Sequence, residues 1–203
     1  MVLEVSDEIL GTFVPIVVYW VYSGIYFLVG LFCDNSRLHS KEDEDQKIMV
    51  TKSEVLRGVL FQQAMQAVVT IILFKVTSVK KLDNVSLPVS AIKLVFGMAM
   101  MDTWQYLMHH SMLFLHKHNT LTVPFSFGAL YNKPIEGFLL DTVGGAFSFL
   151  ASGMTPRVAI FFFSFTTIKT VDDHCGFWLP RINPFHKFFY NNAASQCSHD
   201  VHY

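Results

Sequence analysis

Histidine is the residue type whose number and placement in this chain could support chemistry. The sequence contains nine histidines, and eight of them fall within residues 109–118 and 174–202. Neutral imidazole is a common ligand of iron, copper, zinc and nickel. The three cysteines are far apart and form no CxxC pair, so the sequence predicts neither an iron–sulfur cluster nor a structural zinc site. The pattern favours a metal site that two remote segments share.

The spacing of the histidines within each segment suits ligands on one helix face. His109 and His116 are seven residues apart, and His199 and His202 are three apart. A metal-bound imidazole usually hydrogen-bonds a second group, often a carboxylate. Asp102 lies seven residues before His109 and could have this role. The other candidate carboxylates are Asp172, Asp173 and Asp200.

Other kinds of function find little support in the sequence. The formal net charge is −1, so no basic field points to nucleic acid. The chain has no HExxH motif, no GxSxG motif and no phosphate-binding glycine loop. Histidines near the ends of membrane helices can also lie among lipid headgroups without binding a metal. The confinement of eight histidines to two segments favours the metal site over that alternative.

The hydrophobic segments that position these histidines predict an integral membrane protein made of helices. The sequence is 52% hydrophobic and contains 20 phenylalanines. Residues 9–33 carry no charge, and a membrane span needs about 20 residues. Residues 58–74 form a second uncharged stretch, and a third helix is predicted from Pro88 through residue 108. We therefore expect about three N-terminal spans.

A helical hairpin is predicted for residues 142–168, because two short uncharged stretches flank the turn sequence SGMTPR. Such a hairpin enters and leaves the membrane on the same side. The polar loop at 34–57 contains five Lys and Arg residues, whereas the residues before the first span contain none. The positive-inside rule therefore places this loop in the cytosol. Counting the spans from there puts both histidine-rich segments on the cytosolic side.

Several blocks between residues 94 and 202 resemble the fatty acid hydroxylase superfamily, and in particular plant-type sphingoid base hydroxylases. The blocks are DTWQYLMH, VPFSFGALYN, PIEGFLLDTVGGAFSFLASGMTPR, FFFSFTTIKTVDDHCGFWLP and NPFHKFFYNNAA. The resemblance implies an all-α, multi-pass enzyme of the endoplasmic reticulum membrane with a di-iron centre. It implies C4-hydroxylation of sphinganine to phytosphingosine with molecular oxygen. The electrons would come from NADPH through cytochrome b5 and its reductase.

Carried over position by position, the resemblance implies a set of site residues and partners. Asp102 and Asp173 would be the carboxylates that support the ligands. The implied partners are a long-chain-base lipid, cytochrome b5 with its reductase, and further subunits in a homo- or hetero-oligomer. Residues 1–93 would hold membrane spans and the polar loop, and 94–203 a hydroxylase domain truncated at its C-terminus. The implied iron ligands are His109, His110, His118, His174, His199 and His202.

The histidine boxes of this chain depart from the family pattern. The first box of the family reads HxxxH, whereas His109 and His110 are adjacent here. The last box reads HDxHH in the family and HDVHY in this chain. Two alternatives follow from these departures and from the wider superfamily. One is a catalytically impaired isoform that acts as a membrane partner subunit, and the other is a sterol or fatty-acyl oxidase.

Overall fold

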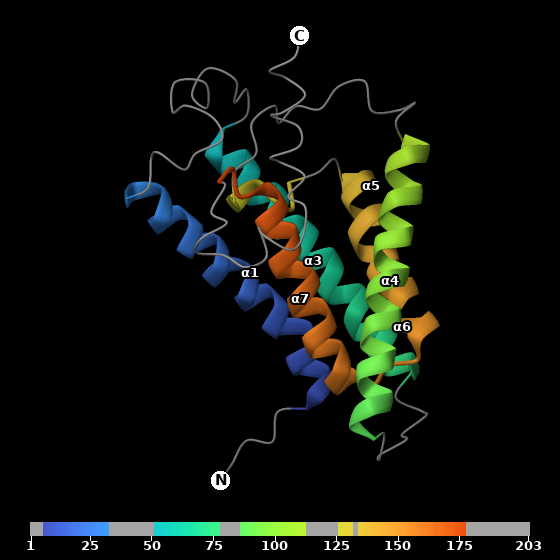
Figure 1. The fold of residues 1–203 in the computed structure, drawn as a ribbon. Coiled ribbons are helices and arrows are strands. Elements are labelled where there is room, and N and C mark those ends of the chain that lie inside the picture. Colours follow the sequence, from blue (N-terminus) through green and yellow to red (C-terminus); the bar gives the residue numbers. More distant parts are fainter. Residues whose placement is uncertain (1–5, 33–50, 78–85, 113–125, 132–133, 178–203) are drawn as a thin grey trace, which may run out of the picture. The chain divides into compact units, whose positions relative to one another are not determined.

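The computed structural model of the chain is built from helices, and no strand occurs among the residues that it describes (Figure 1). These residues are 6–32, 51–77, 86–112, 126–131 and 134–177. The long helices are α1 (Asp7–Phe32), α3 (Lys52–Thr77), α4 (Leu87–Met112) and α7 (Pro156–His174). The shorter elements are the 3-10 turn η2 (Ser126–Gly128), α5 (Pro134–Gly137), the π-helix η3 (Phe138–Val143) and α6 (Gly144–Ser152). The expected all-α class is confirmed.

Three helical stretches in the described part of the chain are long and apolar enough to cross a membrane. They are α1, α3 and the stretch Ile135–Ser152, which runs through α5, η3 and α6. The first two match the uncharged stretches at 9–33 and 58–74. The third lies in the predicted hairpin and not in α4, whose sequence includes Lys93, Asp102 and two histidines. Large apolar side chains are exposed along α1, as expected for contact with lipid; they include Phe13, Val17, Val21, Ile25, Leu28 and Leu31.

The predicted hairpin is confirmed by the turn between α6 and α7. Helix α6 ends at Gly153, whose φ of 57° lies in the left-handed region that glycine enters at no steric cost. Pro156 then begins α7, a position that proline favours because its missing N–H is not needed there. Lys93 of α4 donates a hydrogen bond of 2.8 Å to the Gly153 carbonyl, which fixes the turn to the start of α4.

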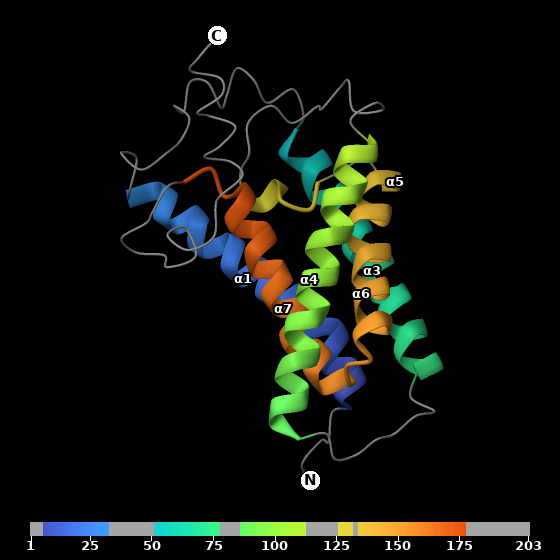
Figure 2. The ribbon, with the colours of Figure 1, turned by 45° about the vertical axis from the view of Figure 1, so that its right-hand side comes forward.

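The described residues fall into two compact units, and α1, α3 and α7 contribute to both. Unit 1 comprises residues 1–17, 60–117 and 132–166. In this unit α4 and α6 lie side by side (Figures 1 and 2). Small residues allow the close approach: a Cβ built on Gly144 would lie 2.5 Å from Cδ1 of Trp104. The buried apolar core of unit 1 consists of Phe74, Met101, Phe149, Met154, Ala159 and Phe162.

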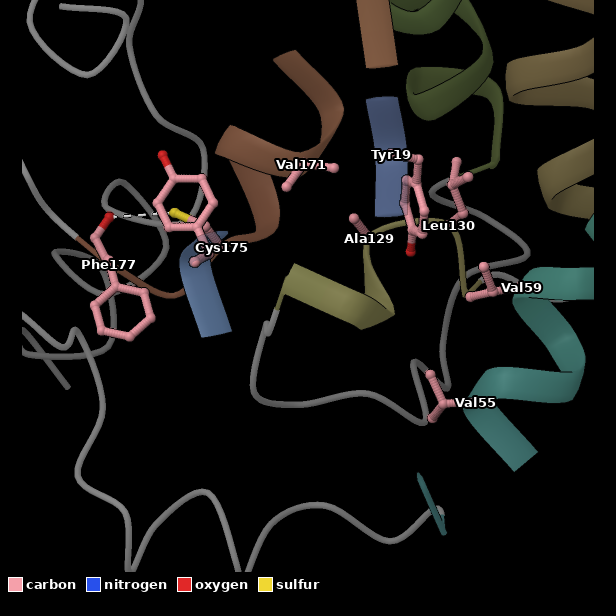
Figure 3. Packing of buried hydrophobic residues seen from close by; sticks show 9 residues of the cluster. Tyr19, Val55, Val59, Ala129, Leu130, Val171, Cys175 and Phe177 are labelled. Carbon is pink, nitrogen blue, oxygen red and sulfur yellow. Dashed lines mark hydrogen bonds between the residues drawn. The ribbon is translucent and has the colours of Figure 1, made fainter. Parts of the chain in front are cut away.

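Unit 2 comprises residues 18–59, 118–131 and 167–203. Hydrogen bonds fix the η2 segment to α1 within this unit. Ser23 and Ser126 each donate from the side chain to the other's carbonyl oxygen, at 3.2 and 3.3 Å, and the Tyr19 hydroxyl donates to the Phe127 carbonyl at 3.0 Å. The hydrophobic residues around them, shown in Figure 3, are Tyr19, Tyr26, Val55, Val59, Ala129, Leu130, Val171, Cys175 and Phe177.

A buried carboxylate, that of Asp172, joins the last turn of α7 to α1 in unit 2. Tyr22 and Tyr26 both donate their hydroxyl protons to Oδ1 of Asp172, at 2.8 and 2.5 Å. The two tyrosines are four residues apart, so they lie on one face of α1. Asp172 is 4% exposed and is therefore withdrawn from water. We call this arrangement the tyrosine–Asp172 clamp. It compensates the cost of burying the charge, because hydrogen bonds to a carboxylate are stronger than those between neutral groups.

Replacing Gly144 by Ala is expected to lower stability, because the added methyl group would clash with Trp104. Overpacking of this kind costs about 1–3 kcal/mol. Gly24→Ala is the matched control, since a Cβ at Gly24 meets nothing within 4 Å. The control should be neutral or more stable, because alanine favours a helix. Thermal unfolding in detergent measures both variants. Equal stability of the two variants would show that α4 and α6 do not approach this closely.

Replacing Tyr26 by Phe is expected to lower the free energy of unfolding by about 1.5–3 kcal/mol, the usual worth of a hydrogen bond to a charged group. Thermal and denaturant unfolding of the protein in detergent give this value. Tyr106→Phe serves as the control, because Tyr106 is 70% exposed; its effect should stay within about 0.5 kcal/mol. A loss for Tyr26→Phe no larger than that of the control would contradict the clamp.

Candidate metal centre

His174, a predicted metal ligand, is the last residue of α7, and one nitrogen of its imidazole is held by the helix. The ring is exposed, and Nδ1 lies 2.9 Å from the carbonyl oxygen of Thr170, one helical turn earlier. A carbonyl oxygen only accepts hydrogen bonds, so Nδ1 must carry the proton. Nε2 is then the nitrogen with a lone pair. Metal-ligating histidines commonly hold the other ring nitrogen in this way.

The residues around His174 fix the end of α7. The tyrosine–Asp172 clamp lies two residues before the histidine. Asp173 forms an ion pair with Lys169 at 3.2 Å, one turn earlier on the same helix. Oδ2 of Asp173 therefore contacts the Lys169 ammonium group of its own helix and not a histidine. Its predicted role as a carboxylate that supports a ligand stays a prediction.

Cys175 follows the candidate ligand directly but is not suited to bind a metal itself. The side chain is 2% exposed, and its thiol donates to the Phe177 carbonyl at 3.5 Å. Burial raises the pKa of the Cys175 thiol to about 12, so the thiol remains protonated at neutral pH. Only the thiolate is a good metal ligand. This agrees with the sequence-based view that the site depends on imidazole nitrogens.

The second group of candidate residues lies on α4, in unit 1. His109 and His110 fall in its last turn as neighbouring residues of a continuous helix. Neighbours in an α-helix point in directions about 100° apart, so the two rings cannot meet one metal from the same helix face. His110 is exposed, with its ring 6.3 Å from that of Tyr106. Asp102, predicted to support a ligand, is exposed on the same helix.

The described residues alone do not assemble a complete metal site. No group of three or more His, Cys, Asp or Glu side chains suited to a metal ion occurs among them. The donor chemistry of His174 fits an iron ligand, and His110 offers a second accessible imidazole. The predicted ligands that lie outside the described residues are His118, His199 and His202, together with the side chain of His109.

Sequence reasoning did not anticipate the clamp that holds this site in place. Asp172 was predicted only as one of four candidate carboxylates, without its two tyrosine partners. A usable signal was present, because two tyrosines four residues apart within an apolar span present two hydroxyl groups that need partners. Their acceptor comes from a helix about 150 residues away, as the separations of 150 and 146 residues show. No local pattern reveals such a pairing.

Comparison with characterised proteins identifies close relatives along nearly the whole chain. Sphinganine C4-monooxygenase 2 of Arabidopsis thaliana is 56% identical, covering 98% of this chain and 80% of the relative. Very-long-chain aldehyde decarbonylase GL1-9 of Oryza sativa subsp. japonica is 50% identical, with the same coverage. Sphingolipid C4-hydroxylase SUR2 of Saccharomyces cerevisiae is 34% identical, covering 98% of this chain and 66% of the relative.

Two further comparisons returned nothing: no family model matches the chain, and no solved structure does. The alignment with the first relative extends over 211 positions, although the chain has 203 residues. The relative therefore contains residues, within the aligned region, that this chain lacks. The alignment nevertheless covers 98% of this chain. The chain belongs to the sphingoid base C4-hydroxylase family of the fatty acid hydroxylase superfamily.

Proposed function

We propose that this chain hydroxylates C4 of sphinganine, a long-chain base, to give phytosphingosine. The observation that carries the proposal is the 56% identity to a sphinganine C4-monooxygenase over 98% of the chain. The family consists of oxygen-using enzymes that act on lipids, and the apolar helices α1 and α3 agree with a substrate that arrives from the membrane. C4 is an unactivated carbon, so its oxidation requires an oxidant stronger than any amino-acid side chain supplies.

Iron held by histidines would supply the activation of oxygen that the reaction needs. Nε2 of His174 would be one ligand, since its tautomer is set by the Thr170 carbonyl. The remaining ligands would come from His109, His110, His118, His199 and His202, and the electrons from NADPH through cytochrome b5 and its reductase. The described residues contribute positioning: the tyrosine–Asp172 clamp holds the turn of α7 that ends at His174.

The apolar helices would hold the hydrocarbon chain of the substrate. Large apolar residues are exposed on α1, α3 and α4, and a lipid chain can contact such faces without displacing water. Residues 1–93 would serve chiefly as membrane anchor, and residues 94–203 would carry the chemistry. The endoplasmic reticulum is the expected membrane, with both histidine-rich segments on the cytosolic side, where cytochrome b5 reductase can deliver electrons.

A second candidate is a partner subunit that lacks activity of its own. It is favoured by the adjacency of His109 and His110 in α4 and by the residues that Sphinganine C4-monooxygenase 2 of Arabidopsis thaliana contains within the aligned region and this chain lacks. In this case the chain would associate with an intact hydroxylase in the membrane. A third candidate, oxidation of another fatty-acyl or sterol lipid, is favoured by the 50% identity to the rice protein named as an aldehyde decarbonylase.

Replacing His174 by Ala is expected to abolish iron binding and hydroxylation. Changing a group that merely supports a metal ligand costs about 10–100-fold in affinity or activity, and loss of the ligand itself should cost more. Iron per chain and conversion of sphinganine to phytosphingosine are measured on protein in detergent, with cytochrome b5, its reductase and NADPH. His39→Ala is the control, because His39 lies outside both histidine-rich segments.

The outcomes of this experiment separate the three candidates. Wild-type protein that binds iron and converts sphinganine, with both lost in His174→Ala, supports the hydroxylase. Wild-type protein that neither binds iron nor turns over, yet co-purifies with a full-length hydroxylase, supports the partner subunit. Conversion of another lipid in preference to sphinganine supports the third candidate. Full activity of His174→Ala would remove this histidine from the ligand set.

The proposed orientation predicts which segments face the lumen. A glycosylation acceptor added before α1 should be modified in microsomes, and one inserted in the loop at 34–57 should not, because the loop is expected in the cytosol. The native acceptor sequence Asn84-Val85-Ser86 is removed first by Asn84→Gln. The shift in electrophoretic mobility reports modification. Modification of the 34–57 loop would reverse the proposed orientation.

A further inference from the structure

Asp141 is an acidic residue inside a helical stretch that can cross the membrane. It lies in the π-helix η3, six residues after the start of the candidate span Ile135–Ser152. Its Oδ2 atom is buried and has no hydrogen-bond partner among the described residues. Ionisable residues at such positions are costly to bury and usually serve a function. Asp141 therefore requires an explanation that the proposed iron chemistry does not supply.

The segment that contains Asp141 packs against a polar side chain of α3. Gln62 and Thr142 are each about 95% buried, and Nε2 of Gln62 lies 3.5 Å from Oγ1 of Thr142, the residue that follows Asp141. The π-helical turn interrupts the regular backbone hydrogen bonds of an α-helix. The Leu139 carbonyl of this turn accepts a hydrogen bond of 3.0 Å from the Trp104 indole of α4. A π-turn within a helix is a frequent feature of functional sites. These contacts all lie within unit 1.

The Asp141 carboxyl group has no counter-ion in the described part of unit 1. The ion pairs Arg157–Asp7 and Lys169–Asp173 do not include it. A carboxylate withdrawn from water is stabilised most by a cation that also donates hydrogen bonds. The proposed substrate has such a group, because a sphingoid base carries a primary amine at C2, protonated at neutral pH. The reacting carbon, C4, is two bonds further along its chain.

We propose that Asp141 binds the ammonium group of the long-chain base and thereby selects the free base over its N-acylated form. This inference rests on the proposed function. An amide at C2 carries no charge and would leave the carboxylate buried without compensation, so the N-acylated lipid would bind less well. The placement suits the reaction: α4 contacts η3 through Trp104 and reaches His109 and His110 five and six residues later, about 8–9 Å along the helix axis.

The test compares two substrates in one enzyme. Sphinganine and its N-acetyl amide are supplied to wild-type protein and to Asp141→Asn, and kcat/KM is measured for each. For the free base we expect kcat/KM to fall roughly 10- to 100-fold in the variant, the range for loss of a charged hydrogen bond. For the N-acetyl amide it should change less than about 3-fold. Iron per chain should equal that of wild type, because Asp141 is not a proposed ligand.

Ser164→Ala is the matched control. The Ser164 hydroxyl is also a buried polar atom with no partner among the described residues, and it also lies in unit 1, but it has no charge. This variant should leave the preference between the two substrates unchanged. An equal loss for both substrates in Asp141→Asn, or no loss for either, would overturn the proposal while leaving the hydroxylase function intact. Absence of any turnover by wild-type protein would instead overturn the proposed function.

A second measurement needs no variant, in case Asp141→Asn does not fold. Octadecylamine and octadecanol have the same hydrocarbon chain and differ in the charged group. If a buried carboxylate binds the ammonium group, octadecylamine should inhibit conversion of sphinganine by wild-type protein at least about 10-fold more strongly than octadecanol. Inhibition of equal strength by both compounds would contradict the proposal, because it would show that the enzyme recognises only the hydrocarbon chain.

Discussion

The hydrogen bonds from Tyr22 and Tyr26 to Asp172 are the interaction on which the described part of the candidate site depends. They join α1 to the turn of α7 that ends at His174. Apolar packing allows helices to slide or rotate at little cost, whereas two hydrogen bonds to one carboxylate oxygen specify a single register. The last turn of α7, which carries His174, is thereby held by α1, in which no candidate ligand lies.

The sequence was informative about the helices because their signals are local. Uncharged stretches of sufficient length predicted α1 and α3, and the residues of the SGMTPR turn predicted the break between α6 and α7. The π-helix η3 was not anticipated, because no local pattern distinguishes FLLDTV from an ordinary helical turn. The Leu139 carbonyl of η3 accepts a hydrogen bond from Trp104, which lies 35 residues earlier in the chain.

The candidate site could be predicted from sequence only as a set of residue types. The clustering of histidines and the resemblance to a hydroxylase family indicated imidazole ligands, but neither could indicate that Nδ1 of His174 donates to the Thr170 carbonyl. That bond selects the nitrogen that remains for a metal. The adjacency of His109 and His110 is unfavourable for metal binding, because neighbouring residues of a continuous helix point in directions about 100° apart. In α7, helical geometry places the Thr170 carbonyl one turn before His174, where it holds Nδ1. In α4, the same geometry prevents two neighbouring residues from binding one metal from the same helix face.

The two acidic residues Asp172 and Asp141 differ in the contacts that their carboxyl groups make. Asp172 accepts hydrogen bonds from two tyrosines of the chain itself, so its charge serves to hold helices together. Oδ2 of Asp141 has no such partner among the described residues, although the next residue, Thr142, contacts Gln62. An acidic side chain in a stretch that can cross a membrane is costly to bury, so it usually either is held by contacts or serves a function. Because Oδ2 of Asp141 has no such contact among the described residues, the ammonium group of the proposed substrate is the partner that we infer for it.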